Sequence, residues 1–217
     1  MQHTRKRLVS ELEKYGYRYF FHPTSGIRLN GLLTCSKHEI IRTDSADLKP
    51  VFGGINLSIV EALGSKGYSL VTIEADDTDL HVINIHLSVD WSNKYEKGSK
   101  YNKVQVNAID KLAEVVGSLG NEKIIVVGDF NFRPDCWLYE KVLSSAGLRD
   151  IVPDDFETCL HNLFRFPMPE HGGRVDYIFT KNFPKDSVLD VKLLWDKPVR
   201  GIGYLSDHVA ILASFRL

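Results

Sequence analysis

An uninterrupted apolar run that ends in an acid and an amide lies in the second half of this 217-residue chain. Residues 124–127, Ile-Ile-Val-Val, are all β-branched and predict a strand that is buried on both faces. Gly128 follows, where the backbone can bend without interference from a Cβ. Asp129 and Asn131 are two residues apart, so an extended backbone projects them to the same side. This pair fits a binding site for a metal, a water or a phosphate, and it fits equally well an Asx turn that caps the next helix.

Length and composition place the chain among ordinary globular proteins, with residues 1–217 expected to form a single domain. The 43% hydrophobic and 25% charged content is typical of that class, and the formal net charge of -1 means that a polyanion would have to bind a local basic patch. The three cysteines have no Cys-x-x-Cys spacing and are expected to be buried and reduced. No signal peptide and no apolar stretch of roughly 20 residues is visible, so we expect a cytoplasmic protein unless an upstream targeting segment is missing.

Helix and strand patterns alternate along the chain, as is typical of layered α/β proteins. An amphipathic helix is predicted over residues 4–14, where Leu8, Leu12 and Tyr15 follow one another at i, i+4 and i+7 and would form its apolar face. Further helices are predicted from Gln105 to a cap at Gly120 and over residues 137–146, which Gly147 closes. Strands are predicted over residues 17–21, 32–35, 55–63, 68–74, 80–87, 124–127, 174–179, 188–195 and 209–215. Residues 75–79 form a predicted hairpin loop. Residues 88–101 form a polar loop whose aromatic side chains and lysines either meet a ligand or fold back on the domain.

Three further strand ends carry polar groups. The two-residue period of residues 81–87 places Asn84 and His86 on the face opposite Ile83 and Ile85. Asp176 likewise faces away from its apolar neighbours, and the Ser-Asp-His triplet of residues 206–208 directly precedes the closing strand. Each group alone has an ordinary structural explanation, such as a hydrogen-bonded core histidine or a capping aspartate. Together with Asp129 and Asn131, four strand ends carry polar groups, which indicates that these groups belong to one functional site.

If these strand ends converge, they contain the parts for metal-assisted phosphoryl hydrolysis. His208 would take a proton from water, and Asp176 would hold the other ring nitrogen and fix the tautomer. Asp129 would orient the water, and Asp207 would bind Mg²⁺ through oxygen. Hydrogen bonds to the phosphate oxygens would come from Asn131, Asn84 and His86. Of these three, His86 is also a candidate catalytic residue.

Four motifs occur in a fixed order: Asn-x-His-Leu at 84–87, Gly-Asp-Phe-Asn at 128–131, Arg-x-Asp-Tyr-Ile at 174–178 and Ser-Asp-His at 206–208. Together they resemble the endonuclease/exonuclease/phosphatase superfamily, which includes DNase I-like nucleases, inositol polyphosphate 5-phosphatases and sphingomyelinases. The resemblance implies an α/β fold, a four-layer sandwich of two packed mixed sheets flanked by helices. It also implies His208 as the base, Asp176 as its partner and Asp207 at a Mg²⁺ or Mn²⁺ ion.

The segment Ser-Lys-Gly-Tyr at residues 65–68, followed by the Asn-x-His-Leu motif, is most similar to the sphingomyelinase-like branch of that superfamily. The similarity implies that Lys66 lies near the substrate phosphate, with Glu61 as a candidate salt-bridge partner.

This sequence differs from the family pattern at the start of the chain. Family members begin with a strand that bears an asparagine, followed by a glutamate that is the principal Mg²⁺ ligand, whereas this sequence begins at the helix that comes next. A fragment, a partner chain that supplies the missing first strand, and a degenerate homologue all remain open as explanations. We expect a Mg²⁺-dependent phosphodiesterase acting on a phospholipid headgroup or a nucleic acid, with a catalytically impaired homologue or binding module as the alternative.

Overall fold

A computed structural model describes residues 2–25, 28–29, 31–48, 66–75, 78–90, 92, 94–159 and 173–217. The strand predicted at residues 55–63 and the proposed salt partner Glu61 lie outside the described residues.

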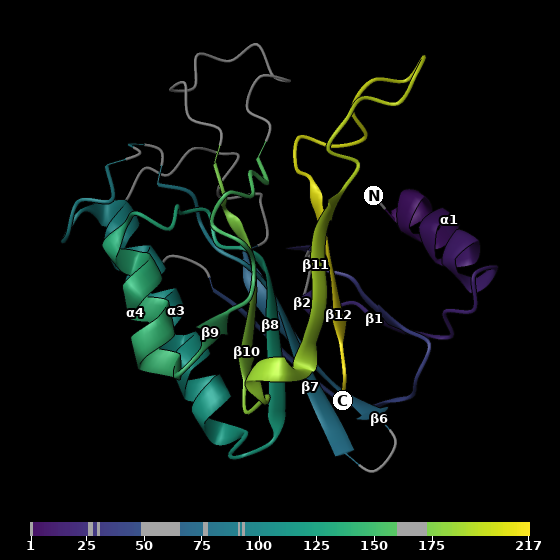
Figure 1. Ribbon diagram of the computed structural model, residues 1–217, viewed down its shortest axis with the longest axis horizontal. Helices are drawn as coiled ribbons and strands as arrows, with labels where there is room; N and C mark the ends of the chain where they lie inside the picture. The colour runs from purple at the N-terminus through teal and green to yellow at the C-terminus, as the bar shows by residue number, and fades with distance from the viewer. Residues whose placement is uncertain are drawn as a thin grey trace.

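A six-stranded mixed sheet forms the centre of the described structure (Figure 1), with the strand order β5-β6-β7-β8-β10-β9. Its members are β5 (Ile40–Asp47), β6 (Gly67–Ala75), β7 (Thr78–His86), β8 (Lys123–Asp129), β9 (Arg149–Asp150) and β10 (Asp176–Lys181). Strands β7 and β8 are parallel, and the other pairs are antiparallel. The parallel pair is joined across α3 (Lys100–Ser118), as parallel strands require a crossover connection.

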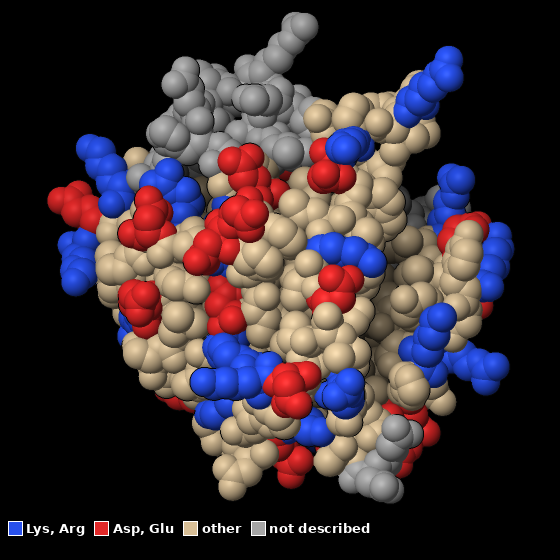
Figure 2. Space-filling model, in the orientation of Figure 1, with Lys and Arg blue, Asp and Glu red and all other residues tan. Residues whose placement is uncertain are grey.

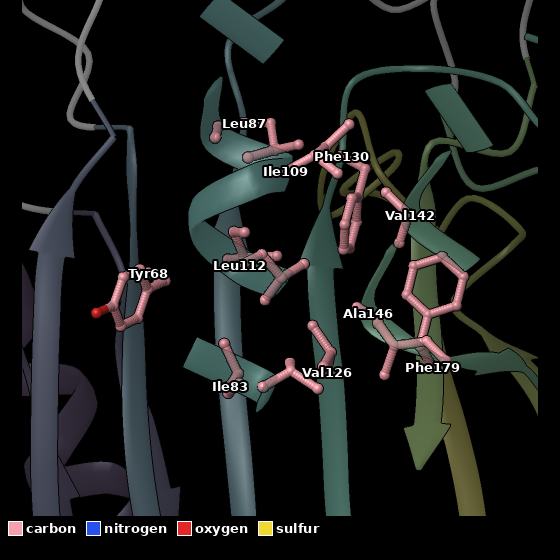
Figure 3. Close-up of a cluster of buried hydrophobic side chains, with 14 of the residues drawn as sticks. Tyr68, Ile83, Leu87, Ile109, Leu112, Val126, Phe130, Val142, Ala146 and Phe179 are labelled. Carbon is pink, nitrogen blue, oxygen red and sulfur yellow. The ribbon is translucent and has the colours of Figure 1, made fainter. Parts of the chain in front are cut away.

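Helices α3 and α4 (Trp137–Ala146) cover one face of this sheet (Figure 1). Figure 3 shows Ile83 of β7 and Val126 of β8 on the same side of the sheet as Leu112 of α3, and all three are buried. Helix α4 spans the predicted residues and ends at Gly147, whose left-handed φ of 64° suits a residue without a side chain.

The opposite face of the central sheet packs against β11 (Val188–Leu194) and β12 (Ala210–Phe215). Ile125 and Ile178 of the central sheet form one cluster with Ile211 and Phe215 of β12. Because Ile124 and Val126 face the helices while Ile125 and Val127 face β12, the prediction that the apolar run is buried on both faces is confirmed.

The remaining elements are the pair β1 (Tyr19–Phe21) and β4 (Thr34–Ser36), the pair β2 (Thr24–Ser25) and β3 (Arg28–Leu29), the short 3-10 helix η2 (Lys185–Ser187) and the helix α1 (Gln2–Glu13). Figure 1 places α1 beyond the β11–β12 pair, on the side away from α3 and α4. The molecule is thus layered as helix, sheet, sheet, helix, as predicted. In the described residues the second layer consists of separate two-stranded pairs rather than one continuous sheet.

Some details of the predicted elements are wrong. Leu8 and Tyr15, expected on the buried face of the first helix, are exposed. Strand β5 continues to Asp47 through a polar stretch that was not predicted, because its backbone pairs with β6 from Ile40 to Asp47. Helix α3 begins five residues before Gln105, where the Ser99 side chain accepts a hydrogen bond from the Asn102 N–H. At its other end the cap is Leu119, and Gly120 follows with a positive φ.

None of the three cysteines, all of which are described, forms a disulfide. Cys136 and Cys159 are buried as expected, and Cys35 is partly buried. Among the described helices, none has the length and apolar character needed to cross a membrane.

Candidate active site

Three predicted site residues lie side by side where β7, β8 and β10 meet at one end of the sheet. The parallel register of β7 and β8 pairs His86 with Asp129, and the antiparallel register of β8 and β10 pairs Asp129 with Asp176. On the other side of His86, strand β6 pairs Gly67 with it, so Lys66 lies at the end of the same row. The sheet register therefore brings together residues that are far apart in the sequence.

Gly128 allows the close approach of β7 and β8 beside this row. Its φ is 139°, and a Cβ built on it would lie 1.9 Å from the Ile85 carbonyl oxygen. Just beyond it the Leu87 N–H donates to the Asp129 carbonyl oxygen at 2.9 Å. A glycine is thus required at the position where the apolar strand becomes the site.

His86 lies between a lysine and an aspartate. Its Nε2 is 2.5 Å from Lys66 Nζ and 3.3 Å from Asp129 Oδ2. Because an ammonium can only donate, Nε2 accepts from Lys66 when the ring is neutral with its proton on Nδ1. When Nε2 carries the proton, it faces the Asp129 carboxylate instead. Two charged groups of opposite sign thus compete for one ring nitrogen.

The Asp129 carboxylate is held in place by Asn131. Oδ1 of Asp129 accepts from the Asn131 backbone N–H at 2.8 Å, and Oδ2 accepts from Asn131 Nδ2 at 3.0 Å. Asn131 Nδ2 also donates to the Leu87 carbonyl oxygen at 2.9 Å. Asn131 has a positive φ of 53°, a conformation that asparagine adopts more readily than most residues. The Asn131 side-chain amide, which was expected to contact a phosphate, therefore donates both of its hydrogens within the protein. The Asx turn and the candidate site, which the sequence left as alternatives, are formed by the same residues.

His208 is joined to the row through Asp176. Its Nδ1 is 2.7 Å from Asp176 Oδ2, and its side chain remains 30% exposed, so water can reach it. The neighbouring segment anchors both partners, because Thr158 Oγ1 accepts from the Asp176 N–H at 3.0 Å and the Val209 N–H donates to the Thr158 carbonyl oxygen at 2.8 Å. The Cys159 Sγ lies 3.9 Å from His208 Nε2. Neither Thr158 nor Cys159 was expected from the sequence, since no motif marks them.

Burial and neighbouring charges set the protonation of these groups. Burial opposes ionisation of Asp129, but the contact with His86 and the nearby His208 outweigh it and lower the Asp129 pKa. Burial raises the pKa of Asp176 despite its hydrogen bond with His208. The hydrogen bond to Asp176, followed by the contact with Cys159, raises the pKa of His208 to about 11 against the effect of burial. His208 is thus a strongly basic imidazole paired with a carboxyl group.

Arg174 fixes the start of β10 and thereby Asp176. The guanidinium is buried, and it donates to Asp150 Oδ2 at 2.5 Å, to Asp154 Oδ1 at 3.0 Å and to the Val152 carbonyl oxygen at 3.2 Å. It also lies over the Tyr177 ring, 4.8 Å from the centroid. The sequence placed Arg174 in a motif but did not indicate this positioning role.

The remaining two predicted residues are less closely connected to the row. Asn84 shares the His86 face of β7 and donates through Nδ2 to the Leu33 carbonyl oxygen at 3.4 Å. The Asp207 carboxylate is exposed and accepts from the Ser206 hydroxyl at 3.3 Å. No group of three or more His, Cys, Asp or Glu side chains that could hold a metal ion occurs in the part of the chain that is described.

Comparison with known proteins agrees with this architecture. Residues 2–208 match the Endonuclease/Exonuclease/phosphatase family. The chain is 27% identical over 214 residues to a Drosophila melanogaster protein named "Putative neutral sphingomyelinase"; the match covers 93% of this chain and 47% of that protein. The chain therefore spans about half the length of this relative.

Solved structures share the fold at low sequence identity. Beta toxin 275-280 from Staphylococcus aureus matches with a TM-score of 0.74 at 20% identity, covering 98% of this chain and 82% of that one. The F277A, P278A mutant of the same toxin, solved with bound magnesium ions, matches with a TM-score of 0.68 at 16% identity, covering 97% and 78%. Both likenesses establish the fold alone.

Proposed function

Because this chain belongs to the endonuclease/exonuclease/phosphatase family, we propose that it hydrolyses a phosphodiester, and that the substrate is a phospholipid headgroup. The observation that carries the proposal is the Asp176–His208 pair at 2.7 Å, at the end of the row formed by His86 and Asp129. A carboxyl group behind an exposed imidazole is the arrangement that general base catalysis needs.

His208 would accept the proton of the attacking water at Nε2. The hydrogen bond between Nδ1 and Asp176 leaves Nε2 as the nitrogen available to water, since its other neighbour, Cys159 Sγ, is 3.9 Å away and the side chain is 30% exposed. The hydrogen bond to Asp176 raises the pKa of His208, which makes the neutral ring a stronger proton acceptor. Positive charge beside the ring lowers its pKa and favours the neutral form.

Lys66 and His86 would hold the phosphate. Lys66 is buried and its Nζ lies against His86 Nε2, so the ammonium brings hydrogen-bond donors next to the Asp129 carboxylate, while the neutral His86 ring can donate from Nδ1. Donors that are fixed before the substrate arrives stabilise the charge that develops on phosphate oxygens. Asp129, ionised through its contact with His86, would orient the water, and Asn131 would position Asp129 rather than touch the substrate.

A divalent cation, Mg²⁺ or Mn²⁺, is the cofactor that we propose. The described residues offer no three-ligand group, but Mg²⁺ is commonly held by one or two carboxylates together with substrate phosphate oxygens and water. The exposed Asp207 carboxylate, next to His208 in the chain, fits the role of such a ligand. When bound, the ion would neutralise charge on the phosphate.

The choice of a lipid rests on the relative named as a neutral sphingomyelinase and on the sphingomyelinase-like sequence around Lys66. Nucleic acid is the second substrate class, which the family description also includes. A homologue that binds phosphate without hydrolysing it is the alternative function.

Purified protein assayed with Mg²⁺ on sphingomyelin, inositol phosphates and DNA tests the proposal. We expect release of phosphocholine from sphingomyelin at a rate that the His208→Ala variant lowers by at least about a hundredfold. An equal rate for both proteins on every substrate would reject hydrolysis at this site. Mg²⁺ titration of the Asp207→Ala variant separates the metal role, because unchanged affinity would remove Asp207 from the metal site.

A further inference from the structure

The segment between β9 and β10 contains Thr158, whose side chain is fully buried. Three acidic residues precede Thr158 in this segment, and all three are exposed: Asp154, Asp155 and Glu157. Figure 2 shows a group of acidic side chains on the surface over β9 and β10. Asp154 accepts a hydrogen bond from Arg174, but its side chain is 93% exposed, so this ion pair holds the segment only weakly. Thr158, in contrast, is enclosed by protein.

Backbone hydrogen bonds connect Thr158 and Cys159 to two parts of the candidate active site at once. Both N–H groups donate to the Gly173 carbonyl oxygen, at 3.2 Å from Thr158 and at 3.1 Å from Cys159. On the other side, the Val209 N–H donates to the Thr158 carbonyl oxygen at 2.8 Å. Cys159 forms isolated β-bridges with both Gly173 and His208. The two residues thus lie between the chain that leads into β10 and the chain that carries the candidate base.

The Thr158 hydroxyl fixes the start of β10. Its Oγ1 accepts from the Val175 N–H at 3.1 Å and from the Asp176 N–H at 3.0 Å. A backbone N–H that is buried without a partner is costly, so the hydroxyl ties down the position of the Asp176 backbone. Burial raises the pKa of Asp176, and a hydrogen bond from the same hydroxyl opposes this rise, after the larger effect of His208. The hydroxyl therefore contacts Asp176 through both its backbone and its carboxyl group.

His208 depends on the same threonine for its position. Its Nδ1 lies 2.7 Å from Asp176 Oδ2, a short hydrogen bond that a shift of either partner would lengthen. Val209 follows His208 directly, so the hydrogen bond from its N–H to Thr158 fixes the backbone next to the imidazole. One buried residue is thus bonded to the backbone on both sides of the Asp176–His208 pair.

A contribution to stability alone is the ordinary explanation for a buried threonine hydroxyl. Thr180 of β10 is such a case: it is 2% exposed, and its Oγ1 donates to the Arg149 carbonyl oxygen at 3.4 Å, four residues beyond Asp176. Thr158 differs because its hydrogen bonds converge on the two segments that carry the members of one pair. Hydrogen bonds of this kind hold reacting groups at a fixed distance before the substrate arrives.

We infer that Thr158 is a positioning residue, whose hydroxyl sets the distance between Asp176 and His208 at which the imidazole can accept a proton from water. The effect on catalysis rests on the proposed function, whereas the effect on the distance does not. Displacement of a catalytic group by about 1 Å can lower a rate by about a hundredfold. Loss of the hydroxyl should act on kcat rather than on KM, because phosphate binding is assigned to Lys66 and His86 on the other side of the row.

Steady-state kinetics of sphingomyelin hydrolysis with Mg²⁺ test the catalytic effect. Thr158→Val keeps the shape of the side chain and removes the hydroxyl, so kcat should fall about a hundredfold while KM changes by less than about threefold. Thr158→Ser keeps the hydroxyl and should retain most of the wild-type kcat. Thr180→Val is the matched control, because it removes a buried hydroxyl from β10 and should leave kcat unchanged. A folded Thr158→Val protein with the kcat of the wild type would overturn the inference.

A second pair of variants covers the case in which Thr158→Val does not fold. Thr158→Ala and Thr158→Ser differ from each other only in the hydroxyl, so the inference requires a much lower kcat for the alanine variant. Equal kcat values for these two variants would assign Thr158 to packing alone and contradict the inference.

Crystal structures of the wild type and the variants separate this inference from the proposed function. The distance between His208 Nδ1 and Asp176 Oδ2 should stay near 2.7 Å in Thr158→Ser and exceed about 3.2 Å in Thr158→Val or Thr158→Ala. This result, together with a wild-type protein that hydrolyses none of the substrates, would keep the positioning of the pair by Thr158 and reject the proposed function. An unchanged distance in the variants that lack the hydroxyl would overturn the inference, even if kcat fell.

Discussion

Replacement of Gly128 by alanine is expected to damage both the fold and the site. The added Cβ would lie 1.9 Å from the Ile85 carbonyl oxygen and 2.9 Å from its carbonyl carbon. The first distance is about 1.5 Å shorter than an ordinary contact of 3.4 Å, so strands β7 and β8 must separate. The φ of 139° adds strain for any residue with a side chain. We expect a loss of about 3–5 kcal/mol in the free energy of unfolding.

Urea unfolding followed by circular dichroism measures this loss. Gly117→Ala is the matched control: Gly117 lies near the end of α3, and a Cβ there would meet nothing within 4 Å. Alanine should raise stability there by about 0.5–1 kcal/mol. Since His86 and Asp129 are register partners next to Gly128, the Gly128→Ala protein should also lose activity under conditions where it is still folded. A change in stability smaller than about 1 kcal/mol would refute the steric argument.

Three other perturbations have defined outcomes. Burial lowers the pKa of His81, whose Nδ1 contacts Thr72 Oγ1 at 2.9 Å, despite the nearby Glu122 carboxylate. The unfolded chain therefore binds this proton more readily, so the free energy of unfolding should fall as the pH drops below 6.5, and urea titrations of His81→Asn should show a weaker dependence in that range. Arg174→Met should cost about 3–5 kcal/mol in thermal unfolding because it leaves the buried Asp150 carboxylate without its partner. By contrast, Asp154→Asn, at the 93% exposed partner of the same guanidinium, should cost under about 1 kcal/mol, and equal losses would contradict the network as described. Asp176→Asn should lower kcat by about 10²- to 10⁴-fold with little change in KM, and a change confined to KM would assign Asp176 to substrate binding.

The sequence pattern predicted the central layers because burial leaves a strong signal in the chain. The run from Ile124 to Val127 contacts the helical layer and the second sheet alternately, so each of its positions must be apolar. Helix α4 was predicted to the residue because Gly147 marks its end. The N-terminal helix misled the prediction, since its spacing of Leu8, Leu12 and Tyr15 suggested a buried face although Leu8 and Tyr15 are exposed.

The candidate site was only partly predictable. The two-residue period of a strand gives the direction of each side chain, which is why His86 and Asp129 could be placed on the same functional edge. Strand order and register decide which side chains meet, and these depend on contacts between distant segments. The competition of Lys66 and Asp129 for one His86 nitrogen, and the use of both Asn131 amide hydrogens within the protein, follow from that register. Thr158 and Cys159 carry no local signal, because a single hydroxyl or thiol in a loop is ordinary in sequence.

Hydrolysis of sphingomyelin in ¹⁸O-labelled water, followed by mass spectrometry of the products, tests the central claim most directly. If His208 activates water for attack on phosphorus, phosphocholine should carry one ¹⁸O in its phosphoryl group, and the His208→Ala variant should form almost none of this product. Label recovered in the ceramide alcohol, or labelled phosphocholine formed equally by both proteins, would contradict the account.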